Sequence, residues 1–147
     1  MLVTNHVLSG AVIGAVVRRP ISAFVLGVAS HFVLDAVPHW GKFGCGRRFF
    51  LVAVPDGLAG LAAMWIVTAI APPDRRTAVF AGMAGAALPD LDKPSMVAFG
   101  RSPWPRVVNE FHVVIQREGS RRAHYEAAFA LAFSCVALRL LRLRVRK

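Results

Sequence analysis

The chain has 147 residues, of which 56% are hydrophobic and only 18% are charged. A mean hydropathy of +0.52 argues against a soluble domain of ordinary composition. The 18 lysines and arginines exceed the 8 acidic residues by ten charges. These basic residues flank apolar runs and do not form the single basic stripe expected of a nucleic-acid-binding protein. The composition therefore favours a membrane protein without specific nucleic-acid binding.

Five apolar stretches approach or pass the length of about 20 residues that a helix needs to cross a bilayer. They cover approximately residues 2–17, 21–37, 49–71, 77–99 and 125–141. In the fourth stretch we expect regular helix to end at Pro89. The connections alternate between short and long, as an up-and-down bundle requires. We therefore expect an all-α, polytopic helix bundle, a single membrane-embedded domain over residues 1–147, in the inner (cytoplasmic) membrane.

Two further segments complete this organisation. Residues 93–124 are long enough to form a short extramembrane cap between the fourth and fifth segments, with a helix near Val107–Gln116. The tail at 139–147 is basic and follows the last segment. Gly10, Gly14 and Gly27 offer small faces for close helix packing, although membrane helices use many small residues in any case.

Histidine and aspartate are sorted along the chain in a way that arginine is not. If all five segments span, the five histidines and most of the acids fall on one side of the membrane. The lysines and arginines divide nine and nine between the two sides. A general polar surface does not produce this sorting. It indicates a cluster of ionisable ligands at one membrane face.

Two short motifs supply the candidate ligands. His31 and Asp35 are four residues apart, so they share a helix face, and His39 follows just beyond Pro38. In Leu88-Pro89-Asp90-Leu91-Asp92, a proline turn carries two carboxylates. Imidazole and carboxylate donors together suit zinc, with manganese or iron as alternatives, and one or two ions. Each motif also has a simpler interpretation, an interfacial imidazole or an aspartate turn after a helix.

These two motifs, with an early Asn5-His6, resemble the YdjM-type family of inner-membrane metal-dependent hydrolases. The segment from His31 to His39 is also similar to part of the metal site of zinc-dependent phospholipase C and single-strand nucleases. The resemblance implies a membrane helix bundle with a hydrolytic metal centre. It assigns ligand roles to His6, His31, Asp35, His39, Asp90 and Asp92.

The sequence departs from that family near the last helix. The family has a compact histidine-rich segment there, whereas this chain reads FHVVIQREGSRRAHYE. His124 matches the second histidine of the family segment and is assigned as a ligand. His112 is displaced and is left as either a ligand or a bystander.

The leading hypothesis is a membrane-bound hydrolase that cleaves a phosphoester of a lipid or membrane-associated substrate. Asp35 or Asp56 is the candidate general base. Arg121 and Arg122 are candidates for binding the phosphate, or they form a solvated loop. Membrane lipids and the substrate are the expected partners.

Two other functions remain open. A metal-ion or proton transporter also places histidine and aspartate in membrane helices, but its pathway should carry polar groups to the opposite face, where the segments are almost purely apolar. A non-catalytic scaffold is expected if no metal binds.

Overall fold

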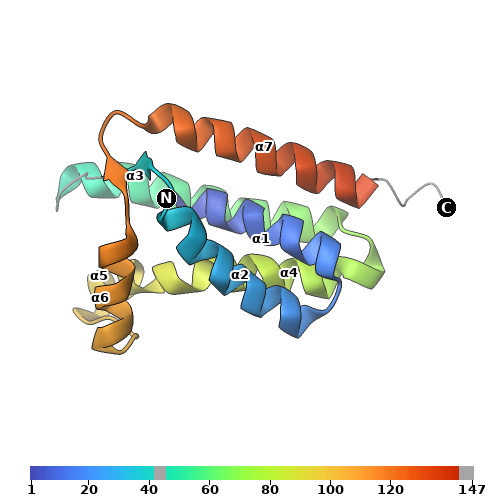
Figure 1. The fold of residues 1–147 in the computed structure, drawn as a ribbon, viewed down its shortest axis with the longest axis horizontal. Helices are drawn as coiled ribbons and strands as arrows, with labels where there is room; N and C mark the ends of the chain where they lie inside the picture. Colours follow the sequence, from blue (N-terminus) through green and yellow to red (C-terminus); the bar gives the residue numbers. More distant parts are fainter. Residues whose placement is uncertain (42–45, 143–147) are drawn as a thin grey trace.

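A computed structural model describes residues 1–41 and 46–142 and shows an all-helical protein (Figure 1). Long helices run up and down beside one another, and shorter elements gather at one end of this bundle. The long helices are α1 (Val3–Val17), α2 (Pro20–Asp35), α3 (Arg47–Ile70), α4 (Pro73–Ala87) and α7 (Ala123–Arg142). The short elements are β1 (His39–Trp40), the 3-10 turn η1 (Leu88–Leu91), α5 (Asp92–Phe99), α6 (Arg106–Ile115) and β2 (Glu118–Gly119).

Helix α4 lies against both α1 and α2, and glycines allow the backbones to touch. A Cβ atom added at Gly10 would lie 2.3 Å from the Gly82 carbonyl oxygen, and one added at Gly27 would lie 2.4 Å from the same oxygen. A Cβ at Gly14 would lie 2.4 Å from the Cα of Val79. Such separations are far below van der Waals contact. The small faces expected at Gly10, Gly14 and Gly27 are therefore packing surfaces around α4.

The exposed sides of α3 and α7 are apolar. Both helices are long and apolar enough to cross a membrane, and only 11% and 17% of their most apolar windows are buried inside the protein. A core helix of a soluble protein would be mostly buried. Helices α1 and α2 are apolar but shorter. At 15 residues, α1 extends about 22 Å, which is less than the thickness of a bilayer core.

The expected fourth segment, 77–99, is not one helix. Regular α-helix begins at Pro73 and ends at Ala87, and it is followed by η1 and then by α5. Pro89 explains the break, because it has no N–H to donate to the preceding turn. Part of the expected basic tail, residues 143–147, lies outside the described residues.

The cap is held to the bundle by a short parallel ladder. β1 pairs with β2, with His39 opposite Glu118 and Trp40 opposite Gly119. Just before this ladder, α6 crosses the end of the bundle (Figure 1). The cap helix expected near 107–116 occupies Arg106–Ile115. Its position places His112 over the end of α2.

Candidate metal centre

Buried ionisable side chains converge where α1 begins and where α2 and α4 end. His6 comes from the first turns of α1, and His31 and Asp35 come from the last turns of α2. All three are completely shielded from solvent. Asp90 lies in η1, Asp92 begins α5 and His112 lies on the buried side of α6. We call these six residues the His/Asp cluster. A group of this charge is costly to bury unless its members are paired or bind a cation.

Asp35 lies at the middle of the cluster. Its Oδ2 atom is 2.9 Å from Nε2 of His112 and 3.2 Å from Nε2 of His31. Its Oδ1 atom is 3.2 Å from Nε2 of His6 and 2.5 Å from the amino group of Met1. Both oxygens therefore already have partners. This arrangement fits a ligand or a carboxylate that orients the imidazoles better than a free general base.

The orientation of His31 is fixed from outside the cluster. Its Nδ1 is 2.8 Å from the Ala86 carbonyl oxygen, which can only accept a hydrogen bond. Nδ1 therefore carries the proton in the neutral ring, and the Nε2 lone pair faces His112 and Asp35. A backbone acceptor behind an imidazole is the usual means of orienting a metal-binding histidine. The ring of His6 stacks on His31 with a centroid separation of 3.9 Å.

Within the described residues, three overlapping groups have donor atoms close enough to hold a metal ion. One consists of His6, His31 and Asp90, and another of His31, Asp35 and His112. The third consists of Asp90, Asp92 and His112. Since the groups share His31, Asp90 and His112, they form one continuous site. Six donors exceed what a single tetrahedral zinc ion needs.

Unpartnered buried atoms show that these residues fit a metal. Nδ1 of His6 and Oδ1 of Asp92 form no hydrogen bond with any described residue, and Nε2 of His6 has only Oδ1 of Asp35 within 3.2 Å. Leaving such a buried group without a partner costs about 1–3 kcal/mol. A cation held among these atoms would satisfy them, and imidazole and carboxylate are suitable ligands for zinc, manganese or iron.

Lys93 neutralises one edge of the cluster. Its ammonium group contacts Oδ1 of Asp90, the atom that lies 3.9 Å from Nε2 of His31 and 3.8 Å from Nε2 of His112. Burial alone would raise the pKa of the Asp90 carboxyl, but Lys93, His6 and His31 outweigh burial and hold that pKa at about 2. Burial would lower the pKa of Lys93, yet Asp90 raises it. Both groups are therefore charged at neutral pH.

His112 is the residue that the sequence left undecided. In the structure it is buried, and it belongs to two of the three donor groups. The apolar stripe of α6, which includes Val107, Phe111 and Val114, is exposed, and His112 is buried on the other face of the helix. Periodicity would have placed the apolar stripe inside, so no local signal in the sequence identified His112.

His39 lies beside the cluster but outside the three donor groups. It is fully buried, and its Nδ1 donates to the Val37 carbonyl oxygen over 2.8 Å. Its Nε2 has no hydrogen-bond partner among the described residues. Burial lowers the pKa of this imidazole, which keeps it neutral near pH 7. The structure therefore leaves His39 available as an outlying ligand.

Asp56, a candidate general base, has a structural role instead. Its Oδ2 accepts a hydrogen bond from the Val3 amide over 2.7 Å, and its Oδ1 accepts bonds from the amide and hydroxyl of Thr4. It thus satisfies amides at the start of α1 that no turn of that helix can satisfy. Glu126 makes similar bonds to the Leu2 amide and the Asn5 side chain.

The structure does not bring His124, Arg121 or Arg122 to the cluster. His124 is exposed at the start of α7, and its ring lies against Tyr125. Arg121 is exposed, and Nη1 of Arg122 donates to the Arg117 carbonyl oxygen over 2.7 Å. The family resemblance suggested His124 by its place in the sequence, but α6 presents His112 to the cluster in its stead.

Comparisons with known proteins give no match from which a function could be assigned. No family model matches the chain, and neither a curated protein nor a solved structure matches it. The positions of the buried histidines and aspartates are thus the basis for any functional conclusion.

Proposed function

We propose that the protein is a membrane-bound, metal-dependent hydrolase that cleaves a phosphoester of a lipid or membrane-associated substrate. The observation that carries the proposal is the His/Asp cluster, six donors from five elements, five of them buried, at one end of a helix bundle with apolar outer faces. We place the chain as a multi-pass protein of the inner membrane. This proposal agrees with the resemblance to the YdjM-type family.

The donors favour two zinc ions, because the three groups overlap and together supply more ligands than one ion takes. When bound, such ions lower the pKa of water toward about 7 and stabilise the charge that develops on a phosphoester. The chain's own residues provide the rest. Ala86 orients His31 through its carbonyl, and Asp35 holds His31 and His112 together.

Asp92 is the best-placed proton acceptor among the carboxylates. Its side chain retains 23% exposure, whereas that of Asp35 retains 1%. A carboxylate at the rim of the cluster can take a proton and pass it to solvent, which the enclosed Asp35 cannot do. We therefore assign this role to Asp92 in place of Asp35 and Asp56.

The transporter alternative has less support. Arg75 is buried near the opposite end of the bundle, and its guanidinium donates to the carbonyls of Ala15 and Leu140. Buried residues between that point and the cluster are mainly apolar or small, such as Val7, Ala11, Val79 and Met83. A hydrated pathway needs polar groups along its length.

The test has two steps. Elemental mass spectrometry of purified protein should find one or two metal ions in the wild type and a large loss in both His31→Ala and Asp90→Ala. Metal-loaded protein should then hydrolyse bis(p-nitrophenyl) phosphate or a phospholipid. A wild type that retains no zinc or manganese after reloading would reject the metal centre. A metal-loaded protein that cleaves no phosphoester in a broad panel would reject the hydrolase.

A further inference from the structure

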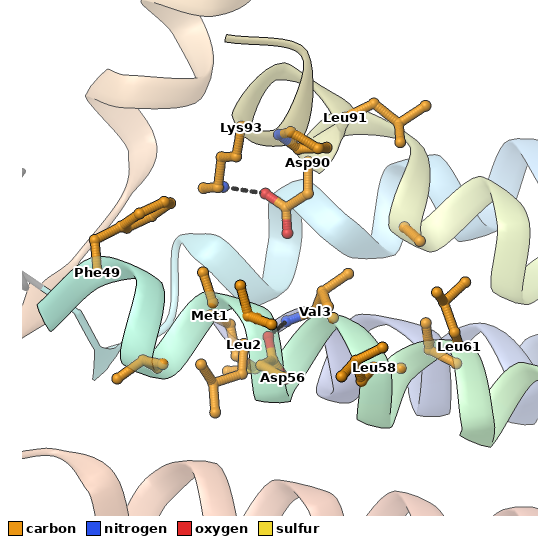
Figure 2. Close-up of a pocket in the computed structure, with 18 of the residues that line it drawn as sticks. Met1, Leu2, Val3, Phe49, Asp56, Leu58, Leu61, Asp90, Leu91 and Lys93 are labelled. Atoms are coloured by element: carbon orange, nitrogen blue, oxygen red, sulfur yellow. Dashed lines mark hydrogen bonds and ion pairs between the residues drawn. The ribbon is translucent and has the colours of Figure 1, made fainter. Parts of the chain in front are cut away.

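A cavity of about 680 Å³ lies beside the His/Asp cluster (Figure 2). One wall is α3, which contributes Phe49, Leu58 and Leu61, and the opposite wall is η1 and α5, with Asp90 and Lys93. The start of α1 lies between the two walls. The volume is within the range of about 300–1,000 Å³ that is usual for small-molecule sites.

The cavity has an apolar body, and its charged lining residues are Asp56, Asp90, Lys93 and Glu118. Most of its lining is aliphatic or aromatic. Asp56 also lines the cavity, but its carboxylate already accepts hydrogen bonds from the Val3 amide and the Thr4 hydroxyl at the start of α1. The cavity reaches the surface along α3, because Leu58 and Leu61 line it and are also 64% and 66% exposed. An apolar chain can therefore enter sideways from the hydrophobic surroundings of α3.

Part of this charged lining is shared with the metal centre. Asp90 belongs to two donor groups of the His/Asp cluster and also lines the cavity. Its carboxylate contacts the Lys93 ammonium. A divalent cation bound to Asp90 would weaken this contact, because the cation and the ammonium repel each other. Lys93, whose side chain is 39% exposed, would then have its charge free at the mouth of the cavity.

We propose that this cavity binds the hydrocarbon chain of an anionic lipid phosphate and that Lys93 pairs with the phosphate when metal occupies Asp90. The inference rests on the proposed hydrolase and names its substrate class. A lipid whose hydrocarbon chain lies along α3 would have its phosphate between Lys93 and the His/Asp cluster. The Lys93 ammonium supplies the positive charge that pairs with an anionic head, and the apolar lining selects a long hydrocarbon chain.

Gly57 allows the cavity to be filled without touching the cluster. It lines the cavity, and a Cβ added there meets no heavy atom within 4 Å. Gly57→Leu should therefore fold and occupy part of the chain-binding volume. The matched control is Ala59→Leu, two residues along the same helix, at an exposed position outside the cavity lining.

Binding is measured by native mass spectrometry of zinc-loaded protein with three probes: dodecyl phosphate, dodecyltrimethylammonium and methyl phosphate. We expect one dodecyl phosphate to bind at least about tenfold more tightly than either other probe, a difference of about 1.4 kcal/mol. Gly57→Leu should weaken dodecyl phosphate binding by about tenfold, and Ala59→Leu should leave it unchanged. Lys93→Met should weaken dodecyl phosphate about tenfold without weakening dodecyltrimethylammonium.

Equal affinity for the two dodecyl probes, or no effect of Gly57→Leu, would overturn the proposal. Hydrolysis assays distinguish failure of the chain-binding cavity from failure of the proposed hydrolase activity. If the wild type and Gly57→Leu cleave both bis(p-nitrophenyl) phosphate and a long-chain phosphatidic acid equally well, the hydrolase stands and the chain-binding cavity is rejected. Loss of long-chain cleavage alone in Gly57→Leu supports both.

Discussion

The inner helices α1, α2 and α4 differ from the outer helices α3 and α7 in both packing and chemistry. The inner three touch backbone to backbone at glycines, and α1 and α2 carry three of the six residues of the His/Asp cluster. The outer two expose most of their apolar length. Their ionisable residues either support α1, as Asp56 and Glu126 do, or lie away from the cluster.

The ability to cross a membrane and the presence of the His/Asp cluster therefore belong to different helices, which hydropathy alone does not distinguish. The two helices that are long and apolar enough to cross a membrane expose most of their length. The helices α1 and α2, which carry His6, His31 and Asp35, are shorter and bury these polar groups inside the protein, although α2 also exposes an apolar side. A search for long apolar helices therefore identifies α3 and α7. It does not identify α1 and α2, which carry three residues of the His/Asp cluster.

The largest expected effect comes from removing an inner-layer donor. His31 belongs to two of the donor groups, so His31→Ala should abolish stoichiometric metal binding. His112→Ala should lower metal content to a similar degree, because that residue also joins two groups. Elemental mass spectrometry of purified, zinc-reloaded protein measures both.

The matched control is His124→Ala, because His124 is exposed and its ring lies against Tyr125. It should retain the metal content of the wild type. If His124→Ala lost metal and His112→Ala kept it, the family resemblance would describe the ligands better than the geometry does.

Next in size is the loss of close packing in the inner layer. Gly10→Ala places a methyl group 2.3 Å from the Gly82 carbonyl oxygen, so it should destabilise the protein by at least about 2 kcal/mol. Gly57→Ala makes the same chemical change in α3, where the Cβ meets nothing. It should be neutral or stabilise by up to about 1 kcal/mol, since alanine favours helix. Denaturant unfolding in detergent compares the two, and equal effects would contradict the contact between α1 and α4.

A smaller effect is expected where the layers meet. Asp56→Ala removes the carboxylate that binds the amides of Val3 and Thr4, and it should destabilise the fold by about 1–2 kcal/mol. Metal content should not change. The folded, metal-loaded variant should hydrolyse its substrate within about twofold of the wild-type rate. Loss of a general base would instead lower the rate by about 100-fold or more, and that result would restore Asp56 as the base.

The smallest effect belongs to the outer surface. Val136→Ala truncates a side chain of α7 that is 45% exposed, whereas Val79→Ala truncates one that is fully buried in α4. We expect a change below about 0.5 kcal/mol for Val136→Ala and a loss of about 1 kcal/mol or more for Val79→Ala. Thermal unfolding in the same detergent measures the pair. A larger loss at Val136 would mean that the outer face of α7 packs against something.

Much of the fold could be predicted from the sequence because apolar runs and breakers are local signals. The ends of α1 and α2 follow from the run Arg18-Arg19-Pro20 and from Pro38. The spacing of His31 and Asp35 fixed their shared face. The convergence of His6 and Asp90 with this pair was expected from the order of the helices, since alternating directions bring these residues to one end.

The remaining parts of the site depend on contacts that no local pattern encodes. Nothing in the spacing of Asp56 shows that its carboxylate meets the start of α1, 52 residues away. His112 lies before α7 and His124 lies in its first turn, and only the path of α6 across the bundle distinguishes them. Lys93 is another example, because its role comes from the cavity beside it.

The order of the donors along the chain has a consequence for biosynthesis. His6, His31 and Asp35 leave the ribosome early, but His112 follows Asp35 by 77 residues. The group of His6, His31 and Asp90 is complete before α6 is made, whereas the other two donor groups both need His112. A metal site that uses all six donors can therefore form only after most of the chain has been synthesised.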